Sequence, residues 1–105
     1  IGTVCVTSEE TMDLEKVTRW LGVLAWGNNK QFDMMRMKGY LSIQGDDKKY
    51  ALQGVHATFE LSPSQIAWSE GERRDSKLVL IGKSLHRADL QAAFQECAWV
   101  AAAGE

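Results

Sequence analysis

The sequence predicts a small α+β domain (β-α-β-β-β-α) with a four-stranded, mainly antiparallel sheet and both helices on one face of that sheet. Three observations predict this class. The chain has 105 residues, so residues 1–105 have the length of a single domain. Four segments alternate apolar and polar residues, and two others repeat apolar residues at helical spacing. In the resulting order of elements, only the first connection is a helical crossover.

Composition and charge exclude several classes of protein. Hydrophobic residues make up 45% of the chain and charged residues 25%, and the net charge of −2 gives no electrostatic reason to expect a nucleic-acid or membrane partner. No apolar run approaches the roughly 20 residues of a membrane span. We expect a cytoplasmic domain. Location in an organelle is not excluded by the sequence, because any targeting peptide would lie upstream. Since the chain begins with Ile and enters a strand at once, we expect it to be a piece of a longer protein.

A first helix is predicted over Leu14–Trp26. Asp13 stands where a helix N-cap is expected. Apolar residues at spacings of three and four form its buried face, namely Leu14, Val17, Leu21 and Leu24. Val23 and Trp26 fall outside that face, and the Gly-Asn-Asn of residues 27–29 supplies a C-terminal stop.

Residues 34–59 form a hairpin around which the other elements are arranged. Its arms cover residues 34–44 and 49–61, with a turn at residues 45–48. Gly39 and Gly54 lie inside the arms, and we expect a backbone or a neighbour to approach closely at both.

The register of the two arms decides which residues share a face. A two-residue loop at residues 46–47 would place the apolar residues of the second arm beside Arg36 and Lys38. A three-residue loop at residues 46–48 would place them beside the apolar face of the first arm, and we adopt it because it separates apolar from polar residues better. On this register the core face holds Met35, Leu41, Ile43, Ala51, Val55, Ala57 and Phe59.

Three further segments complete the fold. A strand over residues 2–6 precedes the first helix, and a fourth strand covers residues 77–81. The long connection between the hairpin and the fourth strand, residues 62–76, holds the only proline. The second helix covers residues 87–101, with His86 at the N-cap position.

Two surfaces are candidates for interaction with another domain or protein. The adopted register leaves one polar face of the hairpin with Arg36, Lys38, Tyr40, Tyr50, Leu52 and His56. Such a face is either simply solvated or a docking surface, and its aromatic and aliphatic members favour docking. On the helix side, Val23, Trp26 and Trp99 form a second exposed apolar set, and Trp is a common interface anchor. We expect at least one of the two sets to be buried in the full-length protein.

No complete catalytic constellation is present, so we assign no catalytic or cofactor-binding residue. Residues 79–84 end in Gly-Lys-Ser as a P-loop does, but the earlier glycine of that loop is missing. No two Cys or His residues have a zinc spacing, which leaves His56 and Cys5 as isolated metal-ligand candidates. Cys5 and Cys97 are interpreted as two buried thiols in a reducing compartment rather than as a disulfide.

Three segments, residues 36–40 (RMKGY), 53–56 (QGVH) and 77–83 (KLVLIGK), follow one another in the same order as motifs of a known family. They resemble the C-terminal domain of CobW-like GTPases, a metallochaperone family that includes the zinc-regulated GTPase metalloprotein activators. RMKGY resembles its R-x-K-G signature, and QGVH resembles a stretch of its eukaryotic branch. Residues 77–83 (KLVLIGK) match a strand of that domain, with Trp68 before it and Leu85 and Leu90 after it. The similarity covers roughly residues 2–98. Two features depart from the family pattern. Bacterial members have an Arg and a Pro-Phe before the first helix, where this chain has Thr-Met-Asp, and many relatives have a histidine-rich segment, whereas this chain has only two His.

The resemblance implies a parent protein with an N-terminal GTPase domain that holds GTP, Mg²⁺ and a transition metal such as zinc. It implies that this chain docks to its own GTPase domain or to a client metalloprotein, without an enzymatic activity of its own. Two other functions stay open: a direct metal-carrying module, and an independent small-molecule-binding domain. Zinc titration against a chelator separates metal carriage from docking.

Overall fold

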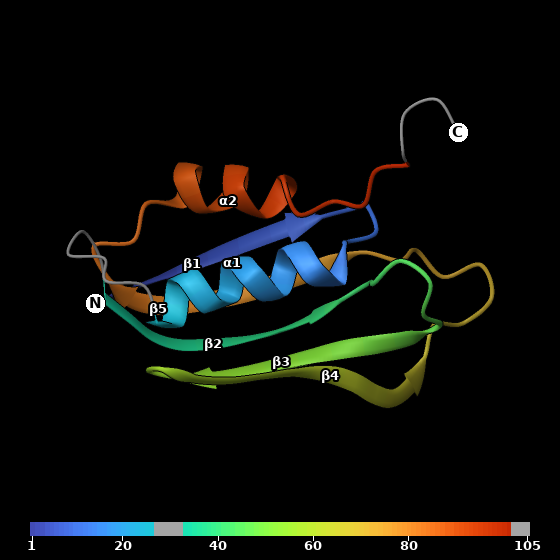
Figure 1. Ribbon diagram of the computed structural model, residues 1–105, viewed down its shortest axis with the longest axis horizontal. Coiled ribbons are helices and arrows are strands. Elements are labelled where there is room, and N and C mark those ends of the chain that lie inside the picture. The colour runs from blue at the N-terminus through green and yellow to red at the C-terminus, as the bar shows by residue number, and fades with distance from the viewer. Residues whose placement is uncertain (27–32, 102–105) are drawn as a thin grey trace.

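The computed structural model describes residues 1–26 and 33–101. Its elements are β1 (Gly2–Ser8), α1 (Leu14–Trp26), β2 (Asp33–Leu41), β3 (Lys48–Val55), β4 (Thr58–Ala67), β5 (Ser76–Lys83) and α2 (Arg87–Gln95). All strands pair antiparallel in one sheet, in the order β1-β5-β2-β3-β4. Both helices cover the same face of this sheet (Figure 1). The predicted α+β class is confirmed, but the sheet has five strands rather than four.

The fifth strand arises because the expected second arm of the hairpin breaks at His56-Ala57. β3 ends at Val55 and β4 begins at Thr58, and β4 then continues to Ala67, into the first part of the segment that we expected to be a loop. His56 takes a left-handed backbone with φ 53°, which histidine tolerates better than most residues. The turn carries no Gly, Asn or Asp to mark it in the sequence. Pro63 is accepted in β4 because, among the described strands, β4 is an edge strand that pairs with β3 alone.

The adopted register of the first hairpin is wrong. Val55 pairs with Arg36 and Tyr50 with Leu41, which gives the face assignment of the two-residue alternative. Tyr50 and Leu52 therefore point into the core, where their exposed fractions are 8% and 1%. This register is more stable because it places Tyr50 and Leu52 on the core face, where they bury far more apolar surface than Ala51 and Val55 would.

A register irregularity in β2 also changes its core face. The pairing of β2 with β5 shifts between Met34 and Arg36, as a β-bulge does. Met34 is consequently buried, while Met35, which we expected in the core, is only half-buried. Gly39 lies farther along the same strand, and a Cβ there would collide with the carbonyl oxygen of Lys77. The close backbone approach expected at Gly39 is thus confirmed.

The first helix has the predicted bounds and the predicted cap. The Asp13 carboxylate accepts hydrogen bonds from the backbone N–H groups of Glu15 (3.0 Å) and Lys16 (3.2 Å). Leu14 is exposed rather than buried, because it lies at the very start of the helix. The expected stop at residues 27–29 lies outside the described residues. The core between helices and sheet is formed mainly by Val4, Val6, Val17, Leu21, Met37, Leu41, Leu52, Leu78, Leu80, Leu90 and Phe94.

The second helix is shorter than predicted and ends at Gln95 rather than at residue 101. His86 occupies the N-cap position, but its side chain makes no capping hydrogen bond. The following segment leaves the helix because it is tied to the chain before α1. The N–H of Trp99 donates to the carbonyl of Thr11 (2.9 Å), and Ala98 forms a bridge with Met12. Trp99 is therefore not a helix residue.

Candidate functional site

One face of the sheet is packed against the helices (Figure 1). The other, which we call the open face, is not covered by a described helix or strand, and only the connection with Trp68 and Glu72 packs against one end of it. The pairings of the five strands align its residues in three rows. Arg36 and Lys38 lie on the central strand of this face and are both exposed. In the order β1, β5, β2, β3, β4, the rows are Thr3-Ile81-Arg36-Val55-Thr58, Cys5-Val79-Lys38-Gln53-Glu60 and Thr7-Lys77-Tyr40-Ala51-Ser62.

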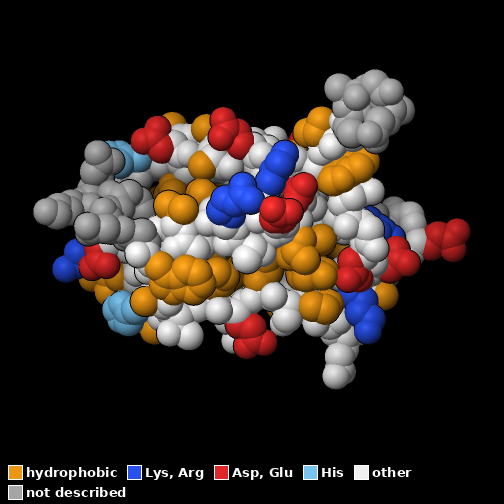
Figure 2. Space-filling model, in the orientation of Figure 1, with side chains coloured by type: hydrophobic (Ala, Val, Ile, Leu, Met, Phe, Trp, Pro, Cys, Tyr) orange, Lys and Arg blue, Asp and Glu red, His pale blue; other side chains and the backbone are white. Residues whose placement is uncertain are grey.

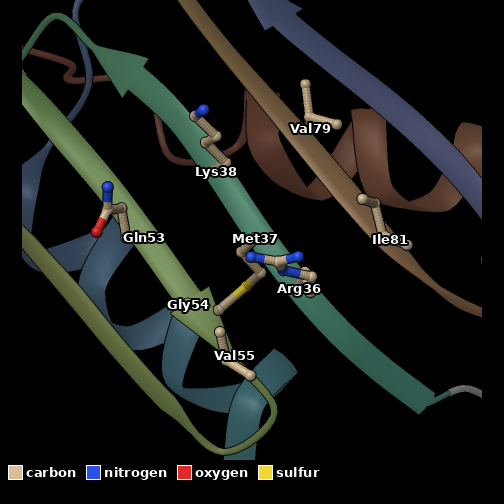
Figure 3. Close-up of a pocket in the computed structure, with 8 residues that line it drawn as sticks. All are labelled: Arg36, Met37, Lys38, Gln53, Gly54, Val55, Val79 and Ile81. Carbon is tan, nitrogen blue, oxygen red and sulfur yellow. The ribbon is translucent and has the colours of Figure 1, made fainter.

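A shallow hollow of about 440 Å³ lies on the open face over β5, β2 and β3. Figure 3 shows the side chains that line it, with the helices behind the sheet. Two cations, Arg36 and Lys38, lie beside the amide of Gln53. Aliphatic side chains complete the lining, contributed by Val55, Val79 and Ile81, whereas the Met37 side chain is buried on the core face. The hollow thus combines positive charge with accessible apolar surface, and we refer to it as the cationic hollow.

Three cations of the open face, Arg36, Lys38 and Lys77, have no counterion among the residues that the structure describes. In the part of the chain that the structure describes, the ion pairs are Arg19–Glu15, Lys49–Glu72, Arg73–Glu9 and Arg74–Asp47, and none includes Arg36, Lys38 or Lys77. The three rows hold a single carboxylate, Glu60, which is separated from Lys38 by β3. This concentration of positive charge stands out in a chain whose net charge is −2.

A second hollow, of about 340 Å³, adjoins the first beyond Tyr40 and Ala51. Here the cation is neutralised. The Lys49 ammonium lies 2.9 Å from a Glu72 carboxylate oxygen and 4.8 Å from the centre of the buried Trp68 ring. Two hydrogen bonds to its carboxylate lower the pKa of Glu72: the larger effect comes from the Ser69 backbone N–H and the smaller from Lys49. This part of the surface is therefore held together internally, whereas Arg36 and Lys38 face outward.

The helix-side set is exposed as predicted, but its members do not form one patch. Val23 is 53% exposed, Trp26 65% and Trp99 43%. The indole N–H of Trp26 donates to the carbonyl of Ala57, and its ring lies 5.1 Å from that of Phe59. Figure 2 shows hydrophobic side chains gathered between α1 and the strands below it. Trp26 thus already covers the turn between β3 and β4, while Trp99 lies beyond the end of α2.

The predicted residues of the hairpin face are separated by the true register. Arg36, Lys38 and Tyr40 lie together on the open face. The placement of Tyr50 and Leu52 with them is wrong, because both are core residues. His56 is exposed in the turn after β3, next to the end of the first row.

The sequence reasoning did not identify Gln53, Val55, Lys77, Val79 and Ile81 as part of this surface. The alternation of residues 77–81 shows which of them share a face, but not that β5 lies between β1 and β2. That neighbour relation is what brings Val79 and Ile81 beside Lys38 and Arg36.

The two metal-ligand candidates lie far apart in the sheet. Cys5 is half-buried in β1, at one edge, and His56 is in the turn between β3 and β4, at the other edge. Among residues 1–26 and 33–101, no three His, Cys, Asp or Glu side chains are grouped so that they could hold a metal ion. The side chains that the structure describes do not fit a resident metal site.

The thiols are free, and their environments differ. Cys97 is buried in the core, and burial raises the pKa of its thiol to about 11. In the same described part of the chain, no helix is long and apolar enough to cross a membrane.

An antiparallel sheet covered by two helices on one side and open on the other defines a two-layer α+β domain. The family model for the cobalamin synthesis protein cobW C-terminal domain matches residues 1–98, and this chain belongs to that family. Two similar solved structures are the zinc-bound YjiA GTPase from E. coli and a zinc-bound triple mutant of YjiA. Each aligns over 93% of this chain at 24% identity with a TM-score of 0.80, and the chain spans 30% of the length of either.

Proposed function

We propose that this chain is the docking domain of a CobW-like GTPase that delivers a metal ion to client proteins, and that this metal is zinc. In this proposal the GTPase domain binds and hydrolyses GTP with Mg²⁺ and carries the metal. The present domain contacts the GTPase domain or the client, and it responds to the nucleotide state without catalysing a reaction. The family membership and the zinc-bound GTPases that share this fold support the proposal.

The open face is the observation that carries a docking role. A sheet normally buries one face and leaves a polar face to water. Here the second face instead presents Val55, which is 52% exposed, and Tyr40, which is 39% exposed, beside Arg36, Lys38 and Lys77, which form no ion pair with any described residue. Exposed apolar groups rimmed by charge are typical of interaction surfaces.

The test adds the GTPase domain to the isotope-labelled 105-residue chain and maps amide resonance shifts with GTP and with GDP. We expect saturable shifts on one surface, with different affinities for the two nucleotide states. The absence of shifts in both states would contradict docking. GTP turnover by the 105-residue chain alone would contradict its non-enzymatic role.

Zinc titration in competition with a chelator tests the alternative of direct metal carriage. We expect no tight one-to-one binding, because Cys5 and His56 lie at opposite edges of the sheet. Tight binding that is lost in Cys5→Ser or His56→Gly would support the carrier function instead.

A further inference from the structure

We propose that the cationic hollow is the contact point for an acidic surface of the GTPase domain, with Arg36 and Lys38 pairing with its carboxylates. This inference rests on the proposed function. It specifies which face of the domain docks and that the partner surface is acidic. It places the contact on the open face of the sheet and not on the helix side.

Charge complementarity gives the sign of the partner. Arg36, Lys38 and Lys77 come from two neighbouring strands, and Tyr40 pairs with Lys77 across them. None of these cations has an ion pair within the described residues, whereas Lys49, Arg73 and Arg74 each have one. Positive charges gathered on one face attract a negative surface and repel a positive one, which sets both orientation and partner choice.

The surroundings of the cations favour a protein over a small anion. Tight phosphate sites use backbone N–H groups at a helix N-terminus or in a loop. In the cationic hollow the lining residues all belong to β2, β3 and β5, and their backbones are paired in the sheet ladder. Only Arg36, Lys38 and Gln53 can donate, and they lie on a broad face with Val55, Val79 and Ile81. An apolar floor between cations suits a protein surface that carries both carboxylates and apolar groups.

The strength expected of this contact favours a partner in the same polypeptide. Three exposed cations around a shallow hollow give a weak, salt-sensitive interaction, as surface ion pairs do. A covalent link between domains raises the local concentration of the partner, so a weak contact is still populated. In the zinc-bound YjiA structures, the region like this chain is 30% of the whole, so most of such a protein lies outside this fold.

Carbodiimide cross-linking of the full-length protein tests the contact directly, because this reagent joins an amine to a carboxylate only where the two touch. We expect Lys38 or Lys77 to join to Asp or Glu residues of the GTPase domain. The yield should fall on the order of tenfold between 50 and 500 mM salt, since the contact is electrostatic. Lys16, exposed on α1 at the other side of the sheet, is the internal control and should give little cross-linking.

Charge reversal gives a second readout with the GTPase domain added in trans. Lys38→Glu and Lys16→Glu change the net charge equally, and both positions are exposed, so both variants should fold. We expect Lys38→Glu to weaken binding on the order of a hundredfold, as loss of a close charge pair does, and Lys16→Glu less than threefold. Methyl resonances of Val55, Val79 and Ile81 should shift on binding to the wild-type chain only.

The outcomes separate this inference from the proposed function. Equal weakening by Lys38→Glu and Lys16→Glu would overturn a specific contact. Binding that resists Lys38→Glu but is lost in Trp26→Ala would overturn the open face and keep the docking function. Displacement by inorganic phosphate, or a dimer of this chain that Lys38→Glu dissociates, would identify a different occupant and also overturn the inference. No binding in any state would overturn both.

Discussion

The side-chain amide of Gln91 in α2 makes to Thr7 the two hydrogen bonds that a neighbouring strand would make. Its Nε2–H donates to the carbonyl of Thr7 (2.8 Å), and its Oε1 accepts from the N–H of Thr7 (3.1 Å). Thr7 lies in β1, which is an edge strand of the described sheet and has β5 as its one neighbouring strand there. Arg87, one turn earlier in the helix, donates to the carbonyl of Cys5 (3.4 Å). The helix thus satisfies backbone groups that would otherwise invite pairing with another chain.

Gln91→Ala should therefore destabilise the fold by about 1–2 kcal/mol, because two partly solvated hydrogen bonds are lost. The amide of Thr7 should exchange its hydrogen faster, which NMR in D₂O measures. Gln95→Ala, an exposed glutamine of the same helix, is the matched control and should change the stability by less than about 0.5 kcal/mol. A Thr7 amide that exchanges at the wild-type rate in Gln91→Ala would contradict this account.

Gly39→Ala should destabilise the domain by about 3 kcal/mol, since added atoms in a packed sheet force the backbone to move. The new Cβ would meet the carbonyl oxygen of Lys77 and lie 2.9 Å from the Cα of Leu78. Gly2→Ala is the control, because nothing lies within 4 Å of its added Cβ. Urea unfolding of both variants measures the difference, and similar midpoints for the two would refute the close approach of β2 and β5.

His56→Gly should leave the fold intact and stabilise it by about 0.5 kcal/mol. At φ 53° a side chain destabilises the folded state by roughly 1–2 kcal/mol, and glycine removes this strain. Glycine also makes the unfolded chain more flexible, which lowers the stability by about 0.5–1 kcal/mol. Ala51→Gly is the control, because Ala51 lies in the extended backbone of β3, where glycine relieves no strain. This variant should be less stable than the wild type by about 0.5–1 kcal/mol. Thermal unfolding compares the two, and a destabilised His56→Gly would show that the imidazole itself supports the turn.

Cys97 should make the stability fall as the pH rises from about 9 to about 11. Burial raises the pKa of this thiol to about 11 in the folded chain, whereas an unfolded cysteine ionises near pH 8.5. Between these values only the unfolded chain loses the proton, so unfolding is favoured; below them the thiol is protonated in both states and has no effect.

The measurement compares the unfolding free energy of the wild-type chain and Cys97→Ala from pH 8 to pH 11. The difference between the two isolates Cys97 from the other groups that titrate at alkaline pH. We expect Cys97→Ala to lack part of the alkaline loss, although its smaller side chain lowers its stability at neutral pH. Parallel curves for the two proteins would argue against a protonated, buried Cys97.

Local sequence signals were sufficient for the elements that depend on neighbours in the chain. The bounds of α1 and the Asp13 cap follow from helical periodicity and from a carboxylate placed before the first turn. The α+β class and the position of both helices on one face follow from the order of elements. Arg36, Lys38 and Tyr40 share a face because residues alternate along any single strand.

The tertiary structure decided the features that depend on pairing between distant segments. The sequence did not predict the register that buries Tyr50 and Leu52. It also did not predict the extra strand after His56 or the end of α2 at Gln95. A shift of one residue reverses every side chain of a strand, and the winning register is the one that buries the most apolar surface over the whole sheet.

The sequence by itself therefore determined that this is a CobW-type α+β domain with cations on one strand face. Only the tertiary structure decided that β5 lies between β1 and β2, which puts Val79 and Ile81 beside Lys38 and Arg36. The physical reason is that alternation is a property of one strand, whereas a surface is assembled from several. The cationic hollow exists only once the strands are paired.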